Sequence, residues 1–365
     1  MKKNASYYQE VWQKLRRNFT AMAGLFIILF FCLIALLAYL IAPDRTPHAN
    51  LQTVEIQGKQ PGYSQWFLKI REDQNKKVSS LQGMMEGSPS RYKWIPINSY
   101  SVSGSRLIID RYVDEDTSFF ETYDILLLTK GKPSEIKKLF EKKSYLLGTD
   151  GFGRDILSRL IVGSRVSLLI GLAGVIISLL IGVLLGSLAG YYRGKTDAVI
   201  SWFLNVNWSI PTLLLVFAIT MVLGKGFWQI MLAVGLSLWV NVARLVRGQV
   251  MSVKEREYVE AARALGYSGG RILFRHILPN ISGPILVLAT ANFATAIMLE
   301  AGLSFLGIGV QPPAVSWGLM LRENYNYIIT NNPMVALLPG FAIMLLVLAF
   351  NMLGNGLRDA VDVRH

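Results

Sequence analysis

The chain has 365 residues, of which 52% are hydrophobic and only 17% are charged, and its formal net charge is +13. These averages are too apolar for an ordinary soluble protein and direct attention to membrane-spanning segments. The single cysteine, Cys32, excludes an internal disulfide framework, a cysteine-based metal site and a thiol redox pair.

The first predicted element is a membrane anchor within residues 1–42. No charged residue occurs from Asn18 to Ala42, whereas about 20 helical residues cross a hydrocarbon core of roughly 30 Å. A signal peptide is the alternative interpretation, but the apolar run is too long for one, and Pro43-Asp44 stands where a small-residue cleavage site would be. We therefore predict an uncleaved anchor with a cytoplasmic N-terminus.

Residues 43–147 form a polar insert after this anchor. It is rich in Lys, Glu, Asp, Ser and Gln, and it contains no apolar run long enough to span a membrane. Hydrophobic patterning predicts strands at Ser105–Val113 and Tyr123–Thr129 and a helix at Pro133–Lys143. About 100 residues can bury a small core, so the sequence predicts a small α+β domain between spans one and two.

Residues 148–365 contain five further apolar stretches that are long enough to span, near residues 166–191, 198–223, 227–246, 281–305 and 335–353. The predicted fold is therefore an all-α polytopic membrane protein with six transmembrane helices and the α+β insert. Lysine and arginine precede the first span, follow the second and the last, and are most frequent between the fourth and fifth, where Arg244 and Arg247 begin the basic link. The positive-inside rule then makes both termini and the link at 252–279 cytoplasmic, and the insert extracytoplasmic.

Three cations disagree with this orientation, because Arg154, Arg159 and Arg165 would lie outside, just before the second span. We interpret Asp155–Arg165 as an amphipathic helix at the outer membrane interface, with its aliphatic side chains toward lipid or protein. Before it, Thr149-Asp150-Gly151 is typical of a turn with an aspartate cap.

A search for reactive groups finds no catalytic, cofactor or metal site in the sequence. The three histidines, His48, His276 and His365, are scattered, and no metalloprotease or nucleophile-elbow motif occurs. Gly190–Thr196 resembles the end of a phosphate-binding loop, but it has three residues between its glycines where that loop has four, and it follows a predicted membrane helix. We predict that the chain is not an enzyme and does not hydrolyse ATP by itself.

The long basic link predicts a helix, a glycine turn and a second helix. An apolar stripe of Tyr258, Ala261, Ala262 and Leu265 has helical spacing, and Gly266 with Gly269-Gly270 permits a tight turn. Pro279 is predicted to end the second helix and begin the next span. The segment is suited to lying in a groove of another protein, and a helix resting on the membrane surface is the alternative.

The spacing of this link resembles the coupling loop of bacterial ABC-importer permeases: Glu260-Ala261-Ala262, then Gly266, then Leu278-Pro279 twelve residues after that glycine. His276 departs from the aliphatic residue that is usual there. Residues 147–159 and 300–318 resemble segments of the dipeptide and oligopeptide permeases of the "C" type. The resemblance implies that the loop contacts an ATPase through the following residues: Glu257, Tyr258, Glu260, Ala261, Ala262, Leu265, Gly266, Arg271, Leu278 and Pro279.

By the same resemblance, the chain is half of a translocation pathway in a bacterial inner membrane and works by alternating access. Its implied partners are a sister permease, two ATP-binding subunits that hold ATP and magnesium, an external substrate-binding protein and the lipid bilayer, with no nucleic acid. Peptides are the favoured cargo, while nickel chelates, glutathione and oligosaccharides travel through similar permeases. A secondary transporter would require intramembrane acid–base groups and inverted repeats, and a membrane-tethered sensor would leave the coupling loop without a purpose.

Polar residues within the predicted spans are candidates for the pathway or its gate. They are Asn205, Asn207, Ser209, Asn241, Asn292, Thr295, Glu300 and Trp317. The asparagines have a structural alternative as interhelical hydrogen-bonding groups. Glu300 has two alternatives, a partner of Arg322 or a solvated rim residue, and Trp317 has the alternative of an interfacial aromatic in an outer loop.

Overall fold

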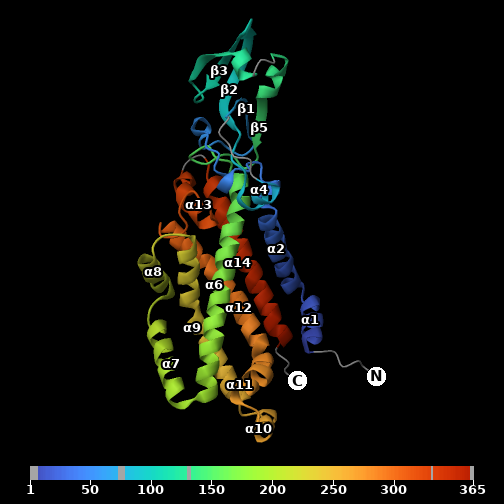
Figure 1. Cartoon of the computed structure of the whole chain (residues 1–365), viewed down its shortest axis with the longest axis vertical. Helices are drawn as coiled ribbons and strands as arrows, with labels where there is room; N and C mark the ends of the chain where they lie inside the picture. The colour runs from blue at the N-terminus through green and yellow to red at the C-terminus, as the bar shows by residue number, and fades with distance from the viewer. Residues whose placement is uncertain (1–6, 73–78, 130–132, 330–331, 362–365) are drawn as a thin grey trace, which may run out of the picture. The chain divides into compact units, whose positions relative to one another are not determined.

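The computed structural model describes residues 7–72, 79–129, 133–329 and 332–361 (Figure 1). The chain divides into two compact units. The first, here called the helical unit, comprises residues 1–33, 167–311 and 341–365, and the second, the mixed unit, comprises residues 34–166 and 312–340. Each unit is described by itself.

Long apolar helices dominate the chain. Among the described residues, five helices are long and apolar enough to cross a membrane, and a sixth crossing results if the bent pair α7–α8 is counted as one span. The longer helices, together with the short α3, are α1 Tyr7–Arg17, α2 Phe19–Leu36, α3 Ala38–Ile41, α6 Ile156–Tyr192, α7 Gly194–Trp208, α8 Thr212–Leu223, α9 Phe227–Val253, α12 Ser282–Phe305 and α14 Met334–Val361.

Two of the predicted membrane elements differ from the structure. The third predicted span is not one helix, because α7 and α8 meet at a bend of 96°. Pro211 cannot donate a backbone hydrogen bond, and it precedes the first residue of α8. The predicted separate amphipathic helix at Asp155–Arg165 is also wrong, since all but its first residue lie in the continuous 37-residue helix α6.

Within the helical unit, α6 packs against α9 through a line of glycines spaced four residues apart. A Cβ atom on Gly182 would lie 2.5 Å from the Cβ of Val242, and one on Gly190 would lie 2.7 Å from the carbonyl oxygen of Arg247. A Cβ on Gly186, between them, would clash with the carbonyl oxygen of Ala243. Small residues of this kind allow two membrane helices to approach closely.

The insert within the mixed unit contains a five-stranded antiparallel sheet with strand order β4-β3-β2-β1-β5. Short helices lie between β1 and β2 and between β4 and β5 (Figure 1). The elements are β1 Tyr63–Arg71, α4 Ser80–Glu86, β2 Tyr92–Ser103, β3 Arg106–Tyr112, β4 Ser118–Asp124, α5 Ile125–Leu128, a 3-10 helix at Pro133–Leu139 and β5 Phe140–Tyr145. Leu68, Ile95, Ile97, Leu107 and Ile109 form the core on one face of the sheet.

One predicted strand of the insert is confirmed and two predicted elements are wrong. The strand expected at Ser105–Val113 is β3. The apolar run after Tyr123 is helical, because the Asp124 side chain accepts a hydrogen bond from the Leu126 amide at 2.8 Å and so caps α5. The helix expected at Pro133–Lys143 stops at Leu139, since the following residues pair with β1 as strand β5.

Candidate coupling and translocation sites

The predicted coupling loop begins with α10, Glu257–Ala264, which ends in a glycine cap. Gly266 has a φ of +78°, a conformation that residues with a Cβ rarely adopt. Its amide donates to the Arg263 carbonyl at 2.9 Å, and the Tyr267 amide donates to the Ala262 carbonyl at 3.2 Å. This pair of bonds is the Schellman motif, so the sequence fixes the direction in which the chain leaves α10.

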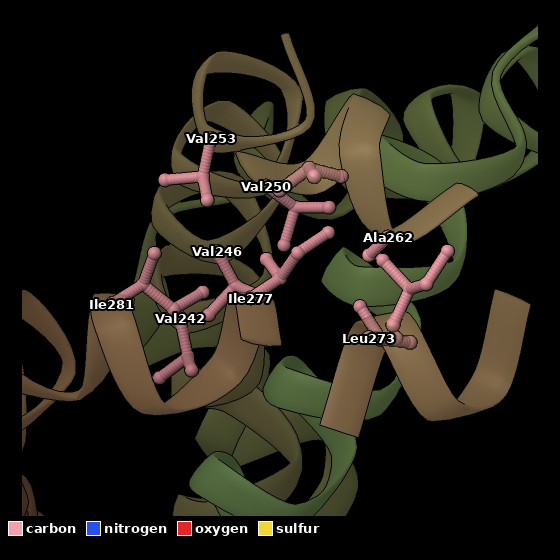
Figure 2. Close-up of a cluster of buried hydrophobic side chains, with 10 residues drawn as sticks. Val242, Val246, Val250, Val253, Ala262, Leu273, Ile277 and Ile281 are labelled. Atoms are coloured by element: carbon pink, nitrogen blue, oxygen red, sulfur yellow. The ribbon is translucent and has the colours of Figure 1, made fainter. Parts of the chain in front are cut away.

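An apolar core holds α10 on the rest of the helical unit (Figure 2). From α9 it takes a stripe of valines spaced three or four residues apart, and from α10 it takes Val259 and Ala262. All ten members are at most 5% exposed: Val242, Val246, Val250, Val253, Val259, Ala262, Ile272, Leu273, Ile277 and Ile281. The loop is therefore a packed extension of α9 and not a loose connection.

The apolar stripe predicted on α10 is divided between two faces. Ala262 lies inside the core, and Val259, which the prediction omitted, is the other buried residue. Ala261 is exposed, Tyr258 is 38% exposed and Leu265 is 73% exposed. An open face of Tyr258, Ala261 and Leu265, at helical spacing, thus stands on a rigid support, with Glu257 and Glu260 also exposed.

The second half of the loop differs from the prediction at Pro279. Helix α11, Gly269–Ile272, continues through a π-helical segment at Leu273–Ile277 and a 3-10 segment at Leu278–Ile281 into α12. Pro279 therefore does not end the helical path; it stands near the start of the 3-10 segment, where a missing amide costs least. Leu278 is partly buried, Pro279 is exposed, and the exposed Arg271 places its guanidinium 4.4 Å from the ring centre of Tyr267.

Four of the predicted pathway residues lie on α7, at its bend and on α9, within the helical unit. Asn205, Ser209 and Asn241 are exposed, and Asn207 is partly buried. Ser209 Oγ donates to the Val206 carbonyl at 2.7 Å. An exposed row of amide side chains in an apolar bundle is costly against lipid, so these side chains require water or another polar surface.

Of the three predicted pathway residues on α12, two are buried and one is exposed. Glu300 is 0% exposed and accepts hydrogen bonds from the hydroxyls of Ser167 at 3.2 Å and Ser304 at 2.8 Å. It is therefore not a solvated rim residue in this conformation; its pairing with Arg322 stays a prediction. Asn292 is 3% exposed, and its amide nitrogen has no hydrogen-bond partner among the described residues. Thr295 is exposed and donates to the Ala291 carbonyl.

Trp317, at the start of α13 Trp317–Asn324, lies fully buried in the mixed unit. Its indole nitrogen donates to the Leu160 carbonyl at 2.9 Å, and a Cβ on Gly163 would lie 3.3 Å from its ring. The alternative of an interfacial aromatic is wrong, since the ring has no exposed surface. In this conformation Trp317 is a packing residue, and a role in the pathway stays a prediction.

Two of the three arginines that opposed the predicted topology, Arg154 and Arg159, belong to a buried ion-pair network in the mixed unit, whereas Arg165 is partly buried and donates a hydrogen bond to the Met85 carbonyl. Arg154 is 4% exposed and Arg159 is 1% exposed, so neither is an interfacial cation. Arg154 Nη2 and Arg159 Nη2 lie 2.7 and 2.8 Å from Oε2 of Glu323, and Arg154 Nε lies 2.7 Å from Oδ2 of Asp150. The carboxylates of Asp150 and Glu323 therefore compensate the two guanidinium groups. Glu323 lies more than 160 positions from both arginines in sequence.

The turn that precedes α6 supplies one of these carboxylates. Oδ1 of Asp150 also accepts from the amides of Phe152 and Arg154, so the predicted aspartate turn is confirmed. The carboxylate of Asp155 accepts from the Ser158 amide at 2.9 Å and thus caps the first turn of α6, and burial raises the pKa of Asp155. Glu323 itself was missed by sequence reasoning, because no local motif marks its partners.

The prediction that the basic link begins at Arg244 and Arg247 is wrong, because both residues lie inside α9 and not in the link after it. Arg247 Nη2 lies 2.7 Å from Oδ2 of Asp197 near the start of α7. The guanidinium carbon of Arg244 lies 3.6 Å from the ring centre of Trp208 at the end of α7. Neither Trp208 nor Asp197 was singled out from the sequence, where their partners are distant.

No group of three or more metal-ligating side chains is close enough to hold a metal ion among the described residues. The surfaces described above are instead the open face of α10 and the exposed polar side chains of α7 and α9. The family model "Binding-protein-dependent transport system inner membrane component" matches residues 182–364, which include the coupling loop, the bend and α12. The chain belongs to this family. A second model, "N-terminal TM domain of oligopeptide transport permease C", matches residues 6–55.

Named relatives agree with this assignment to the ABC transporter permeases. The chain is 43% identical over 220 residues to the oligopeptide transport system permease protein OppC of Bacillus subtilis, covering 60% of this chain and 72% of the relative. It is 43% identical over 219 residues to the glutathione transport system permease protein GsiD of Pectobacterium atrosepticum, covering 60% and 72%.

A third relative matches almost the whole chain. The dipeptide transport system permease protein DppC of Bacillus subtilis is 31% identical over 358 residues, covering 98% of this chain and 86% of the relative. The matched range therefore extends across the insert at 43–147.

Proposed function

We propose that this permease forms half of the translocation pathway of a peptide importer and that α10 docks on an ATP-binding subunit. The observation that carries the proposal is the open face of Tyr258, Ala261 and Leu265 on a helix whose other face is locked into the core. A rigid support transmits displacement, whereas a loose loop would absorb it. Small and apolar exposed residues favour close packing against a partner.

The cargo is inferred from the relatives. Two of them are named for oligopeptide or dipeptide transport, and we propose peptides as the substrate class of this importer. Glutathione, itself a small peptide with an unusual linkage, is the alternative that one relative's name supports. Nickel chelates and oligosaccharides remain alternatives from the resemblance alone.

The importer is completed by a sister permease, two ATP-binding subunits and an external substrate-binding protein. ATP and magnesium belong to the ATP-binding subunits, and this chain contributes motion and not hydrolysis. In the proposed cycle, closure of the ATP-binding subunits moves α10, and the packed link from α10 to α9 carries that movement into the membrane helices.

We infer six spans, with both termini and the coupling loop in the cytoplasm and the insert outside. The count takes α7 and α8 as one broken span. The buried network of Arg154 and Arg159 supports this orientation, because compensated arginines no longer count as topology signals against it. In a Cys32→Ser background, single cysteines at the exposed positions Ser88 and Ser252 test it. An impermeant thiol reagent should label Ser88→Cys from outside and not Ser252→Cys; external labelling of Ser252→Cys would reject the orientation.

The docking proposal is tested by recovery of the ATP-binding subunits with the tagged permease. Ala261→Arg places bulk and charge on the open face of α10, and we expect at least about tenfold less ATP-binding subunit to be recovered. Thr196→Arg is the matched control, because Thr196 is exposed at the start of α7, on the same proposed side of the membrane. Equal recovery with both variants would reject docking through α10.

A further inference from the structure

Arg244 is an arginine within a membrane helix that lacks the carboxylate partner its neighbour has. Arg247, one turn further along α9, forms a two-point ion pair with Asp197. In the described part of the chain, Arg244 makes no ion pair. Its guanidinium carbon lies 3.6 Å from the ring centre of Trp208. An uncompensated charge inside a membrane segment is rare and is a marker of a functional site.

The position of this pair follows from the packing of α7 against α9. Leu204, Val240 and Ala243 are buried in the seam between the two helices. Arg244 and Asn241 each follow a seam residue of α9, and Trp208 lies one turn after Leu204 on α7, at the edge of the 96° bend. Trp208 is 63% exposed and Asn241 is exposed, so the pair stands at the surface of the helical unit.

A surface that carries a guanidinium and an amide is unsuited to contact with acyl chains, so this surface faces water or a polar partner. The cation–aromatic contact holds the guanidinium in place through the ring. A cation–aromatic contact uses the charge of the guanidinium and leaves its N–H groups available for an acceptor. The arrangement therefore offers a fixed fork of donors, and the acceptor that fits such a fork in two-point fashion is a carboxylate or a phosphate.

We propose that Arg244, positioned by Trp208, binds the C-terminal carboxylate of a peptide as it passes the bend between α7 and α8. The proposal rests on the proposed function as a peptide permease. A terminal carboxylate is common to linear peptides of every sequence, so one arginine can guide cargo without selecting its side chains. Asn241, one turn from Arg244 on the same face of α9, supplies a neutral donor for the same group.

The test compares one peptide in two forms, with a free C-terminal carboxylate and with a C-terminal amide, in vesicles that contain the complete importer. The external binding protein is supplied saturated with each form, so that its own preference does not enter the uptake rate. For the wild-type importer we expect uptake of the free form to exceed that of the amide by about tenfold, the factor typical of losing a charge-assisted hydrogen bond. In Arg244→Gln the ratio should fall to about one.

Arg247→Gln is the matched control, because it removes a neighbouring guanidinium that already has a carboxylate partner. It should change both uptake rates by the same factor and leave their ratio at the wild-type value. Arg244→Lys keeps the charge without the fork and should give an intermediate ratio. A wild-type ratio of one, or a ratio that Arg244→Gln leaves unchanged, would overturn the assignment even though peptides are transported.

The other anion that fits Arg244 is the phosphate of an anionic lipid headgroup, and vesicles with and without an anionic lipid separate the two. The uptake ratio should be the same in vesicles of phosphatidylcholine, whose headgroup has no net charge, and in vesicles that also contain the anionic lipid phosphatidylglycerol. A ratio that falls to one when phosphatidylglycerol is present would assign Arg244 to the anionic headgroup and overturn the proposal. If the wild-type importer takes up neither peptide form, the proposed function itself fails, and this inference fails with it.

Discussion

The two compact units of this chain are packed in opposite ways. In the helical unit, α6 and α9 approach each other closely because the glycines at 182, 186 and 190 have no side chains. The mixed unit does the reverse and buries two arginines, for which Asp150 and Glu323 compensate. The comparison teaches that a charge near a predicted span is a topology signal only where it is exposed, because a buried and compensated arginine reports on packing instead.

The largest effect should come from breaking the network of the mixed unit. Glu323→Gln leaves two buried guanidinium groups with one carboxylate, and loss of one partner from a buried pair typically costs about 3–5 kcal/mol. We expect the solubilised variant to unfold at a clearly lower temperature and to lose protection from hydrogen exchange in residues 147–166 first.

Glu115→Gln is the control for this prediction, since Glu115 pairs with Lys59 at 2.9 Å but its side chain is 82% exposed. Removal of such a surface ion pair should change the free energy of unfolding by less than about 1 kcal/mol. Similar losses in Glu115→Gln and Glu323→Gln would show that the burial of the network is not what stabilises this unit.

A smaller effect should follow from adding one methyl group to the glycine line of the helical unit. Gly186→Ala places a Cβ against the backbone carbonyl of Ala243, and overpacking of this kind costs about 1–3 kcal/mol. The matched substitution is Gly248→Ala on α9, where a Cβ would meet no atom within 4 Å. Thermal unfolding of both variants in the same detergent should show a loss for the first and none for the second, because alanine favours a helix over glycine. Equal stability would mean that α6 and α9 can separate at no cost.

The insert contains a third kind of charge, an amine buried against aromatic rings. Lys143 Nζ lies 3.2 Å from the ring centre of Trp94, and burial lowers the pKa of Lys143 to about 8. Since the unfolded chain binds this proton up to about pH 10.4, the free energy of unfolding should rise as the pH increases from about 8 to about 10.4, by at most about 3 kcal/mol, and stay level below that window.

Competitive acylation of the full-length permease measures this pKa directly. The pH dependence of labelling at Lys143, followed by mass spectrometry, should have its midpoint near pH 8. A midpoint near the ordinary lysine value would show that the amine is solvated. Lys143→Met should remove the pH-dependent part of the stability and leave the sheet intact.

Local patterns predicted the parts of this molecule that local interactions determine. The presence of long apolar helices, strand β3, the aspartate turn and the glycine-capped helix α10 depend on residues a few positions apart, and their sequence signals were sufficient. Arg154 with Glu323, Arg244 with Trp208 and β5 with β1 are joined across 35 to 170 positions, roughly. No periodicity marks such pairs, which is why the network was mistaken for an interfacial helix and β5 for the end of a helix.

The coupling loop has a structure that its local sequence determines and a role that we propose, so substitutions in it test the proposed coupling most directly. Gly266 and Gly270 both have open space around the position of a Cβ, but only Gly266 has a positive φ. Alanine at Gly266 should therefore cost about 1 kcal/mol and release the Schellman cap, whereas alanine at Gly270 should be tolerated. The measurement is peptide uptake per ATP hydrolysed, in vesicles that contain the complete importer. The account predicts that Gly266→Ala lowers this ratio several-fold while Gly270→Ala keeps the wild-type value. A wild-type ratio in Gly266→Ala would contradict the claim that this capped helix transmits the motion of the ATP-binding subunits.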